Sequence, residues 1–245
     1  MKKLLMLAMA IVLAASGANA AVLASDTFTY PDGSLVPNGG WANHSGTVGD
    51  LLVASGQAVV THGVPSEDAN LPFAAQASGD VYFAFDFSVD DQGAPLAGTD
   101  FEYFAHFKDS GTFNFGARMD LVSPTGSGDY TVGIATTNGT ADATWGADLT
   151  YDVVYHVVVR YSVGSNIAQL WIDPVAYSDP SILGADMTDP GITVEGFALR
   201  QSDSSDNETI RVDNLIISNA CEDVFSDCPT VANESMTWGA VKALY

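Results

Sequence analysis

The stretch that decides the fold is YDVVYHVVVRYSVGSNIAQLWIDP, residues 151–174 of the 245-residue chain. Five valines between positions 153 and 159 form a nearly continuous run, and β-branched side chains pack well in a strand that is covered on both faces. A polar break that contains Gly164 follows, and apolar character resumes over residues 167–173 before Pro174. This stretch predicts a long β-hairpin in the middle of a sheet.

The rest of the chain also has the pattern of strands. Residues 81–89, VYFAFDFSV, alternate so that one face carries only apolar side chains, namely Val81, Phe83, Phe85, Phe87 and Val89. Further strands are predicted at 26–30, 51–60, 101–108, 112–122, 130–136, 196–201 and 209–218. Turn residues separate these segments, and no helical periodicity runs through them. The pattern predicts an all-β protein, an antiparallel β-sandwich that occupies residues 21–219 as one domain.

The segments 101–108 and 112–122 are predicted to pair as a local hairpin. A three-residue loop at 109–111 places Glu102 opposite Arg118 and His106 opposite Asn114. A five-residue loop would instead place Glu102 opposite Asp120, a pair of like charges, so the shorter loop is favoured. The same register makes Phe113 a core partner of Phe107.

Both ends of the chain have segments of a different character. Residues 1–20 have a basic start, an apolar stretch and a small-residue cleavage motif, which together predict a bacterial secretory signal peptide. Cys221 and Cys228 are predicted to form a local disulfide, as expected of an exported protein. Residues 220–245 therefore form a disulfide-closed loop and a tail, and the i, i+3 spacing near the C-terminus favours a short helix, with an irregular tail as the alternative.

The net charge is -22, and removal of Lys2 and Lys3 with the signal peptide makes it -24. Such an acidic surface repels nucleic acid and anionic lipid, because binding either of them requires clustered Lys or Arg. No segment after the signal peptide resembles a membrane span. The acidity indicates solubility, calcium binding or a high-salt milieu, and solubility is the simplest interpretation.

Four stretches carry a resemblance to a known family: DTFTYPDGSL (26–35), VYFAFDFSV (81–89), YHVVVRYSVGSNIAQLWIDP (155–174) and IRVDNLIIS (210–218). Together they resemble the concanavalin A-like or laminin-G-like jelly rolls of secreted bacterial proteins, over roughly residues 26–218. The resemblance implies a jelly-roll fold. Members of that family include glycan-binding modules, adhesion modules and retaining glycanases, so the fold alone does not choose among these functions.

Catalysis is the second class of function. Retaining glycanases of this fold need two carboxylates on the same side of one strand, and none of the six Glu residues has a carboxylate two positions later. A lyase-like site built from Glu102, His106 and Arg118 on one face of the 101–122 hairpin is the remaining enzymatic alternative. A solvated sheet face explains the same alternation.

Two kinds of binding residue are predicted. Calcium prefers oxygen ligands, and the loop 203–208 offers Asp203 and Asp206, while Asp26 and Asp213 approach each other if the first and last strands pair. Trp41 and Trp145 lie in turn-like stretches and are predicted to form a platform for sugar rings, with covering of the sandwich ends as the alternative.

The leading expectation is a secreted, non-catalytic recognition module that binds an extracellular glycan or cell-surface component. The alternatives are a polysaccharide-active enzyme and a structural protein of surface assembly.

Overall fold

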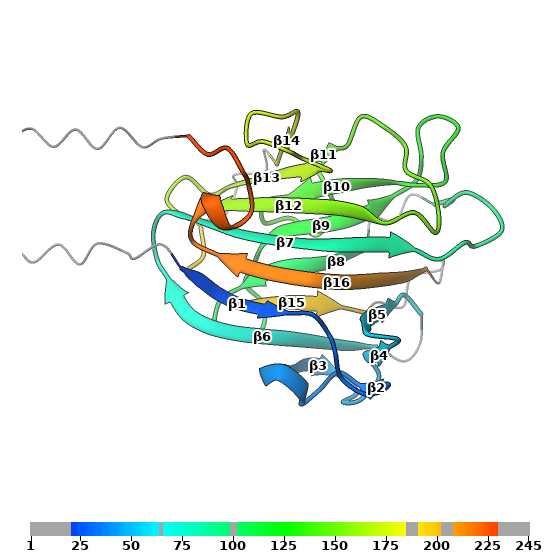
Figure 1. Cartoon of the computed structure of the whole chain (residues 1–245), viewed down its shortest axis with the longest axis horizontal. Helices are drawn as coiled ribbons and strands as arrows, with labels where there is room; N and C mark the ends of the chain where they lie inside the picture. The colour runs from blue at the N-terminus through cyan, green and yellow to red at the C-terminus, as the bar shows by residue number, and fades with distance from the viewer. Residues whose placement is uncertain (1–20, 64–65, 99–101, 185–190, 202–207, 230–245) are drawn as a thin grey trace, which may run out of the picture.

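The computed structural model describes residues 21–63, 66–98, 102–184, 191–201 and 208–229. The signal peptide predicted at 1–20 and the tail predicted at 230–245 lie outside these residues. Two antiparallel sheets pack face to face, which confirms the β-sandwich jelly roll (Figure 1). No helix in the described part of the chain is long and apolar enough to cross a membrane.

The first sheet has nine strands and contains the central hairpin. In spatial order they are β14 (Ile182–Leu183), β13 (Ile167–Ile172), β12 (Tyr155–Ser162), β7 (Asp80–Val89), β16 (Thr209–Ser218), β5 (Gln57–Thr61), β4 (Leu52–Ala54) and β2 (Gly33–Ser34), and β1 (Val22–Asp26) pairs with β16. The pairing of β12 with β13 runs from Val157 opposite Ile172 to Ser162 opposite Ile167. The predicted hairpin is therefore confirmed, and β7 pairs along its other side.

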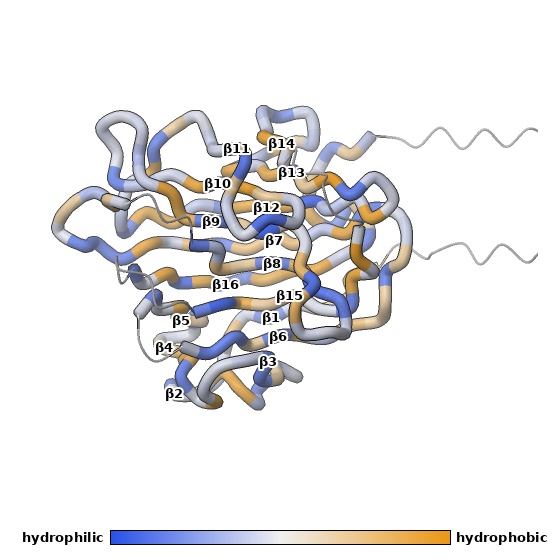
Figure 2. The backbone as a smooth tube through the Cα atoms, turned by 180° about the vertical axis from the view of Figure 1, so that it is seen from behind, coloured by the Kyte–Doolittle hydropathy of each residue, from blue (hydrophilic) through white to orange (hydrophobic). Residues whose placement is uncertain are grey.

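The second sheet has seven strands. In spatial order they are β11 (Ala143–Thr144), β10 (Thr131–Ala135), β9 (Phe115–Val122), β8 (Glu102–Lys108), β15 (Val194–Arg200), β6 (Glu67–Gln76) and β3 (Ala42–Gly46). Two short 3-10 turns complete the elements, η1 (Asn38–Gly40) and η2 (Cys221–Asp223). Alternation of apolar and polar residues along the strands is visible in Figure 2 and gives each sheet one face for the core.

The core lies between the sheets, and β7 contributes the row of side chains that its alternation predicts. Val81, Phe83, Phe85, Phe87 and Val89 are each at most 1% exposed. Phe83 packs at 5.0 Å, between ring centroids, from Phe107 of β8 and from Phe197 of β15. Aromatic contacts of this kind join the two sheets, so the inward face of β7 organises the sandwich.

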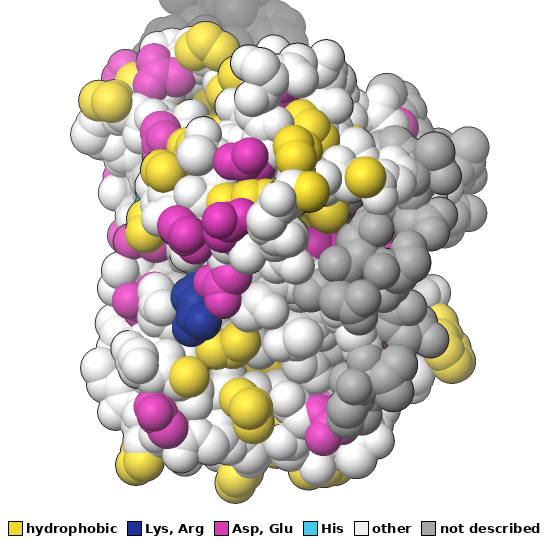
Figure 3. Space-filling view, turned by 90° about the vertical axis from the view of Figure 1, so that its right-hand side faces the viewer, with side chains coloured by type: hydrophobic (Ala, Val, Ile, Leu, Met, Phe, Trp, Pro, Cys, Tyr) yellow, Lys and Arg dark blue, Asp and Glu magenta, His cyan; other side chains and the backbone are white. Residues whose placement is uncertain are grey.

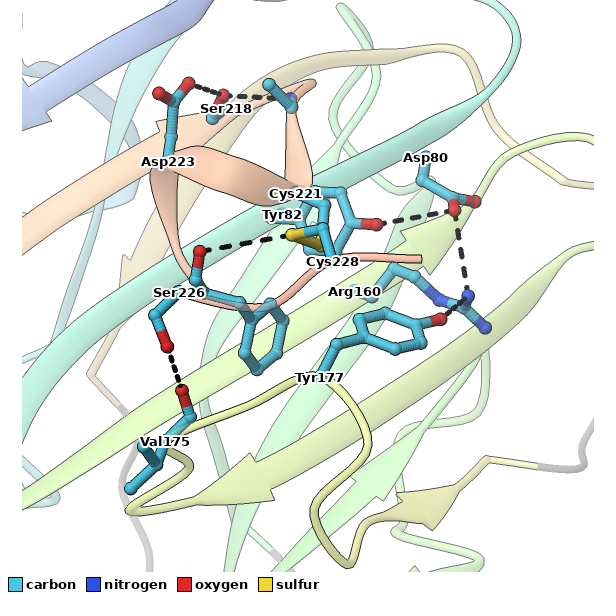
Figure 4. The surroundings of a disulfide bond; sticks show 12 residues. Asp80, Tyr82, Arg160, Val175, Tyr177, Ser218, Cys221, Asp223, Ser226 and Cys228 are labelled. Atoms are coloured by element: carbon cyan, nitrogen blue, oxygen red, sulfur yellow. Dashed lines mark hydrogen bonds and ion pairs between the residues drawn. A yellow bond between two sulfur atoms is a disulfide. The ribbon is translucent and has the colours of Figure 1, made fainter. Parts of the chain in front are cut away.

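The outer face of β7 and β12 is also covered, by a segment that we call the disulfide cap, residues 219–229. Its Cys221 and Cys228 form the predicted disulfide, with 5.9 Å between their Cα atoms (Figure 4). Phe225 of the cap is 6% exposed and lies 5.0 Å from the ring of Trp171. The cap therefore closes a second, smaller apolar cluster, and this explains why β12 is apolar on both faces.

Strand β6 was not predicted because Pro72 interrupts its sequence pattern. Pro72 lies opposite Gly196 of β15, and on its other side β3 pairs only with residues 67–70. Proline lacks an N–H, but at this position β6 is an edge strand, where a proline is tolerated.

Glu67, at the start of β6, is fully buried and organises the turn between β3 and β4. Its Oε2 accepts hydrogen bonds from the N–H groups of Gly49, Asp50 and Leu51 at 2.9, 3.0 and 3.0 Å. Its Oε1 accepts a fourth from the side chain of Asn43 at 3.1 Å. These bonds to a charged acceptor fix a segment that has no regular structure of its own.

The register predicted for the β8–β9 hairpin is wrong. Glu102 lies opposite Leu121, and Lys108 lies opposite Phe115, with two irregularities between these pairs. Ala117 adopts a φ of 53°, so β9 bulges at this point. Because Lys108 pairs with Phe115, the loop covers residues 109–114 and is longer than predicted, and Phe113 is 84% exposed instead of facing the core.

The ends of the described domain lie side by side. Strands β1 and β16 are antiparallel, with Val22 opposite Ser218. The N–H of Ala21 donates to the side chain of Asn219 at 2.8 Å. The chain therefore enters and leaves the sandwich at the same end, as the blue and red segments show (Figure 1).

Candidate functional site

A groove of about 590 Å³ opens beside the β8–β9 loop. Two rings, Phe113 and Phe115, line it, and Phe113 is the most exposed large apolar side chain of the described residues. Polar side chains complete the lining, namely Asp109, Asn114, Arg118, Thr137, Thr193 and Glu195. The groove thus combines an accessible aromatic surface with hydrogen-bond donors and acceptors.

The loop that forms one wall of the groove, residues 109–114, is called the strap here. The Asp109 carboxylate accepts hydrogen bonds from the N–H of Gly111 and from the side chain of Asn114, both at 2.7 Å. The N–H of Ser110 donates to Glu195 of β15 at 2.8 Å. Short Asp side chains commonly stabilise turns in this way, so the strap has a defined shape and lies against β15.

At its C-terminal end the strap continues into Phe115, whose ring contacts two histidines. The centroid of the His106 ring is 4.4 Å from that of Phe115, and the centroid of the His44 ring is 5.7 Å from it. The backbone of Thr112 in the strap also accepts a hydrogen bond from His44. Since His44 belongs to β3 and Phe115 to β9, the strap spans the outer face of the seven-stranded sheet.

Tyr103 is the centre of a second group of polar side chains on this face. The guanidinium carbons of Arg118 and Arg200 lie 4.7 and 4.3 Å from the centre of its ring, and Glu102 forms an ion pair with Arg200 at 3.0 Å. His106 lies 5.4 Å from the same ring. The predicted trio of Glu102, His106 and Arg118 is therefore brought together, although through a different register from the one expected.

Two ionisable groups of this face are fully buried. His106 and Asp120 are 0% exposed. Desolvation holds the pKa of the His106 imidazole well below its usual range, and the nearby Arg118 adds to the effect. Desolvation likewise raises the pKa of the Asp120 carboxyl well above its usual range, which Arg118 partly opposes. Both groups are held in their neutral forms more strongly than in water.

Basic side chains are scarce and concentrated near the groove. The described residues contain five Lys or Arg, of which Lys108, Arg118 and Arg200 belong to β8, β9 and β15 of the seven-stranded sheet. Acidic side chains are spread over the end of the sandwich shown in Figure 3, where only one basic cluster is visible. The seven-stranded sheet thus carries most of the basic side chains in the described part of the chain.

The two tryptophans predicted to bind sugar differ in position. Trp41 is 2% exposed and its indole N–H donates to Asp26 at 2.7 Å, so the prediction that it is exposed is wrong. The turn that carries it folds inward, because the ring packs against Phe28 and Phe197. Trp145 is half-buried and lines a separate cavity of about 300 Å³ with Pro180 and Ile182.

The predicted calcium ligands are only partly described. Asp203 and Asp206 lie outside the described residues. Asp26 does not fit a metal ligand, because its carboxylate already accepts hydrogen bonds from Phe28, Tyr30 and Trp41. Within the ranges that the structure describes, no group of three or more His, Cys, Asp or Glu side chains is arranged to hold a metal ion.

The predicted approach of Asp26 and Asp213 is present, since β1 and β16 pair. Burial raises the pKa of the Asp213 carboxyl, and the charges of Asp86 and Asp26 raise it further. Two carboxylates that repel each other without an intervening cation do not themselves define a calcium site. Calcium binding stays a prediction that depends on residues 203–208.

Several residues of the site were missed by the sequence analysis. Arg200 ends a predicted strand, and alternation with Ala198 places it on the outer face, so its position was available from the pattern. Phe113 was assigned to the core because the loop length was underestimated. Tyr103 was likewise assigned to the core face, and the bulges in the hairpin move it to the other side.

Comparison with known proteins supports the fold. No family model matches the chain, and a search of curated proteins finds no significant match. Among solved structures, a sialidase is similar over 84% of this chain, with 16% identity and a TM-score of 0.54. The chain spans only 19% of that protein's length.

Plant lectins are also similar in structure. Lectin I from Ulex europaeus, in complex with the methyl glycoside of α-L-fucose, matches 81% of this chain and 96% of its own, with 13% identity and a TM-score of 0.48. A seed lectin from Lotus tetragonolobus matches 80% of this chain and 97% of its own, with 13% identity and a TM-score of 0.46. The chain has a concanavalin A-like jelly-roll fold, which is the class that the sandwich topology defines.

Proposed function

We propose that the protein is a non-catalytic glycan-binding module and that the groove beside the strap holds the sugar. The observation that carries this proposal is the 84% exposed ring of Phe113 at a groove that is also lined by Phe115, Ile192 and several polar side chains. A single exposed apolar side chain is common on protein surfaces, so the proposal rests on this ring being part of a groove in which polar groups converge.

The chemistry of the groove matches that of a sugar. A pyranose has an apolar face of C–H groups, which packs against an aromatic ring, and a rim of hydroxyl groups that both donate and accept hydrogen bonds. Phe113 and Phe115 offer the rings, Asn114 offers a donor and an acceptor, and Glu195 offers acceptors. The lectins among the structural neighbours agree with this proposal but do not carry it.

A polysaccharide lyase is the second candidate, and the meeting of Glu102, His106 and Arg118 around Tyr103 favours it. A general base must reach the proton that it abstracts. His106 is 0% exposed and lies beneath Phe115, so the only histidine of the trio has no access to substrate in this arrangement. Binding without cleavage is therefore the function that the geometry supports best.

Native affinity electrophoresis of residues 21–245 tests the proposal, in gels that contain neutral polysaccharides (β-glucan, xylan, mannan) or acidic ones (alginate, pectin). We expect retardation on at least one of them, and at least a tenfold weaker affinity for Phe113→Ala, about 1.4 kcal/mol. Stability of that variant should change by no more than about 0.5 kcal/mol, because the ring is exposed. Val175→Ala is the matched control, since Val175 is 77% exposed and lies away from the groove.

Retardation that Phe113→Ala leaves unchanged would move the binding surface elsewhere, and the cavity at Trp145 is the next surface to test. Cleavage products in any gel would establish the enzyme instead. Running each gel with calcium and with a chelator tests the calcium prediction.

A further inference from the structure

We propose that the strap is an acid-sensitive gate of the groove: protonation of His106 and His44, which both contact the Phe115 ring, releases the strap and dismantles the wall that Phe113 and Asn114 form. This inference concerns regulation of the proposed glycan site and rests on that function for its biological meaning. The release of the strap itself does not depend on any ligand.

The geometry places both histidines at the point that holds the strap. Phe115 is the first residue of β9 and follows the strap directly, so its ring fixes the strap's C-terminal end. His106 lies 4.4 Å from this ring on one side, and His44 lies 5.7 Å away and interacts with the backbone of Thr112. Expelling either imidazole removes one of the contacts of Phe115, whose other partners on this face include Tyr103 and Arg118.

The surroundings of His106 disfavour its protonated form while the strap is closed. It is 0% exposed, and neither of its ring nitrogens has a hydrogen-bond partner within the described part of the chain. An imidazolium has two N–H donors, and leaving both unsatisfied in a dry site is costly. Protonated His106 therefore requires either water or movement of the residues that cover it.

The largest charge effects on His106 come from basic groups on its own strand, on both neighbouring strands and on β3. Arg118 projects from β9, Arg200 from β15, His44 from β3 and Lys108 from β8 itself, and all of them oppose protonation. A second cation among these groups adds repulsion to the desolvation cost. Both effects favour an open strap once His106 is charged.

His44 faces a more balanced environment. Desolvation and Lys108 lower its pKa, whereas the carboxylate of Asp68 on β6, the hydrogen bond to the Thr112 backbone and the carboxylate of Asp109 in the strap oppose the shift, and the net direction is downward. Its protonation is thus also disfavoured while the strap is closed, although less strongly than that of His106. The two histidines act in the same direction.

Three further carboxyl groups lie on this face. Glu102 is ion-paired with Arg200, Glu195 accepts a hydrogen bond from the strap, and the pKa of the buried Asp120 is raised. Because some of these groups also gain protons on acidification, the histidine variants below are needed to assign the effect.

The direction and size of the pH effect on strap closure follow from the linkage between proton binding and closure. A group whose pKa is lower in the closed than in the open state stabilises the closed state above the open-state pKa, and this stabilisation is lost as the pH falls. If the pKa of an exposed histidine, about 6.5, describes the open state, excluding the proton from His106 weakens closure about tenfold at pH 5.5 compared with pH 7.5. Protonation of His44 increases this factor.

Hydrogen exchange tests the gate without any glycan. The amides of Ser110 and Gly111 are hydrogen-bonded in the closed strap, so their protection factors, corrected for intrinsic exchange, report its closure. We expect these factors to fall about tenfold or more between pH 7.5 and pH 5.5. His106→Phe keeps a ring against Phe115 but has no titrating group, so most of the fall should disappear in this variant.

His44→Gln should remove the smaller part of the fall and is the second variant should His106→Phe not fold. His156→Gln is the control and should behave as the unaltered protein, because His156 is half-exposed and bonds to Asp86 on the other sheet. Protection that is independent of pH in the unaltered protein, or a fall that survives in both His106→Phe and His44→Gln, would overturn the gate. A gate that opens with acid in a protein that binds no polysaccharide at either pH would overturn only the proposed function.

Discussion

The disulfide cap is expected to contribute a definite share of the stability. The double variant Cys221→Ala, Cys228→Ala removes a cross-link between residues separated by 7 positions. For a loop of this length the chain-entropy relation gives a loss of about 2.5 kcal/mol in the free energy of unfolding. For a domain of roughly 200 residues, that loss corresponds to a decrease of about 5–10 °C in Tm.

Urea unfolding followed by far-UV circular dichroism and by tryptophan fluorescence measures this change. Trp171 is 0% exposed and lies under Phe225, so a cap that detaches first exposes it before the sandwich unfolds. Glu222→Ala is the control, because Glu222 lies in the cap and is exposed. A loss below about 1 kcal/mol would refute the reasoning. It would mean that the packing of Phe225 keeps the cap ordered in the unfolded state even without the disulfide.

Two further predictions concern buried carboxyl groups. Glu67→Gln replaces three charge-assisted hydrogen bonds from Gly49, Asp50 and Leu51 by neutral ones. Urea unfolding should show that the free energy of unfolding decreases by about 3 kcal/mol. A decrease as small as that of the control Glu222→Gln would mean that these bonds are not formed in solution. Asp120→Asn removes a group whose pKa is raised in the folded state, and such a group costs stability increasingly as the pH rises above the unfolded value of about 3.9. The Tm of Asp120→Asn relative to the unaltered protein should therefore rise between pH 4 and pH 8, and the opposite trend would show that Asp120 is stabilised as a carboxylate.

The sequence was sufficient for the parts of the fold in which one physical signal dominates. The alternation in β7 and the valines at 157–159 in β12 reflect burial on one face and on both faces, and both segments form strands, whereas Val153 and Val154 of the same predicted run lie before β12 and are 41% and 60% exposed. Strand β6 was not predicted because it contains Pro72, and a proline argues against a strand in the interior of a sheet. Whether such a proline faces an edge depends on how far the neighbouring strand extends, which the local sequence does not contain.

The candidate site was harder to predict because it depends on a longer loop and on two irregularities in the hairpin. The structure brings Glu102, His106 and Arg118 together around Tyr103, but Lys108 pairs with Phe115, so the strap is longer than predicted, and the register shifts on both sides of Ala105. Avoidance of the Glu102–Asp120 pair decided between two loop lengths that are both too short, because Glu102 lies opposite Leu121 and Asp120 opposite Tyr103. Exposure of Phe113 follows from the longer strap.

The adjacent ends of the domain make the order of its strands along the chain exchangeable. Since Ala21 contacts Asn219 and both lie at one end of the sandwich, a flexible linker from Pro229 to Ala21 would close the chain into a ring without crossing either sheet. The ring could then be cut at an exposed turn such as the one at Gly93. A circular permutant of this kind would keep every strand pairing and the disulfide cap, and would move both ends of the chain to a different part of the surface.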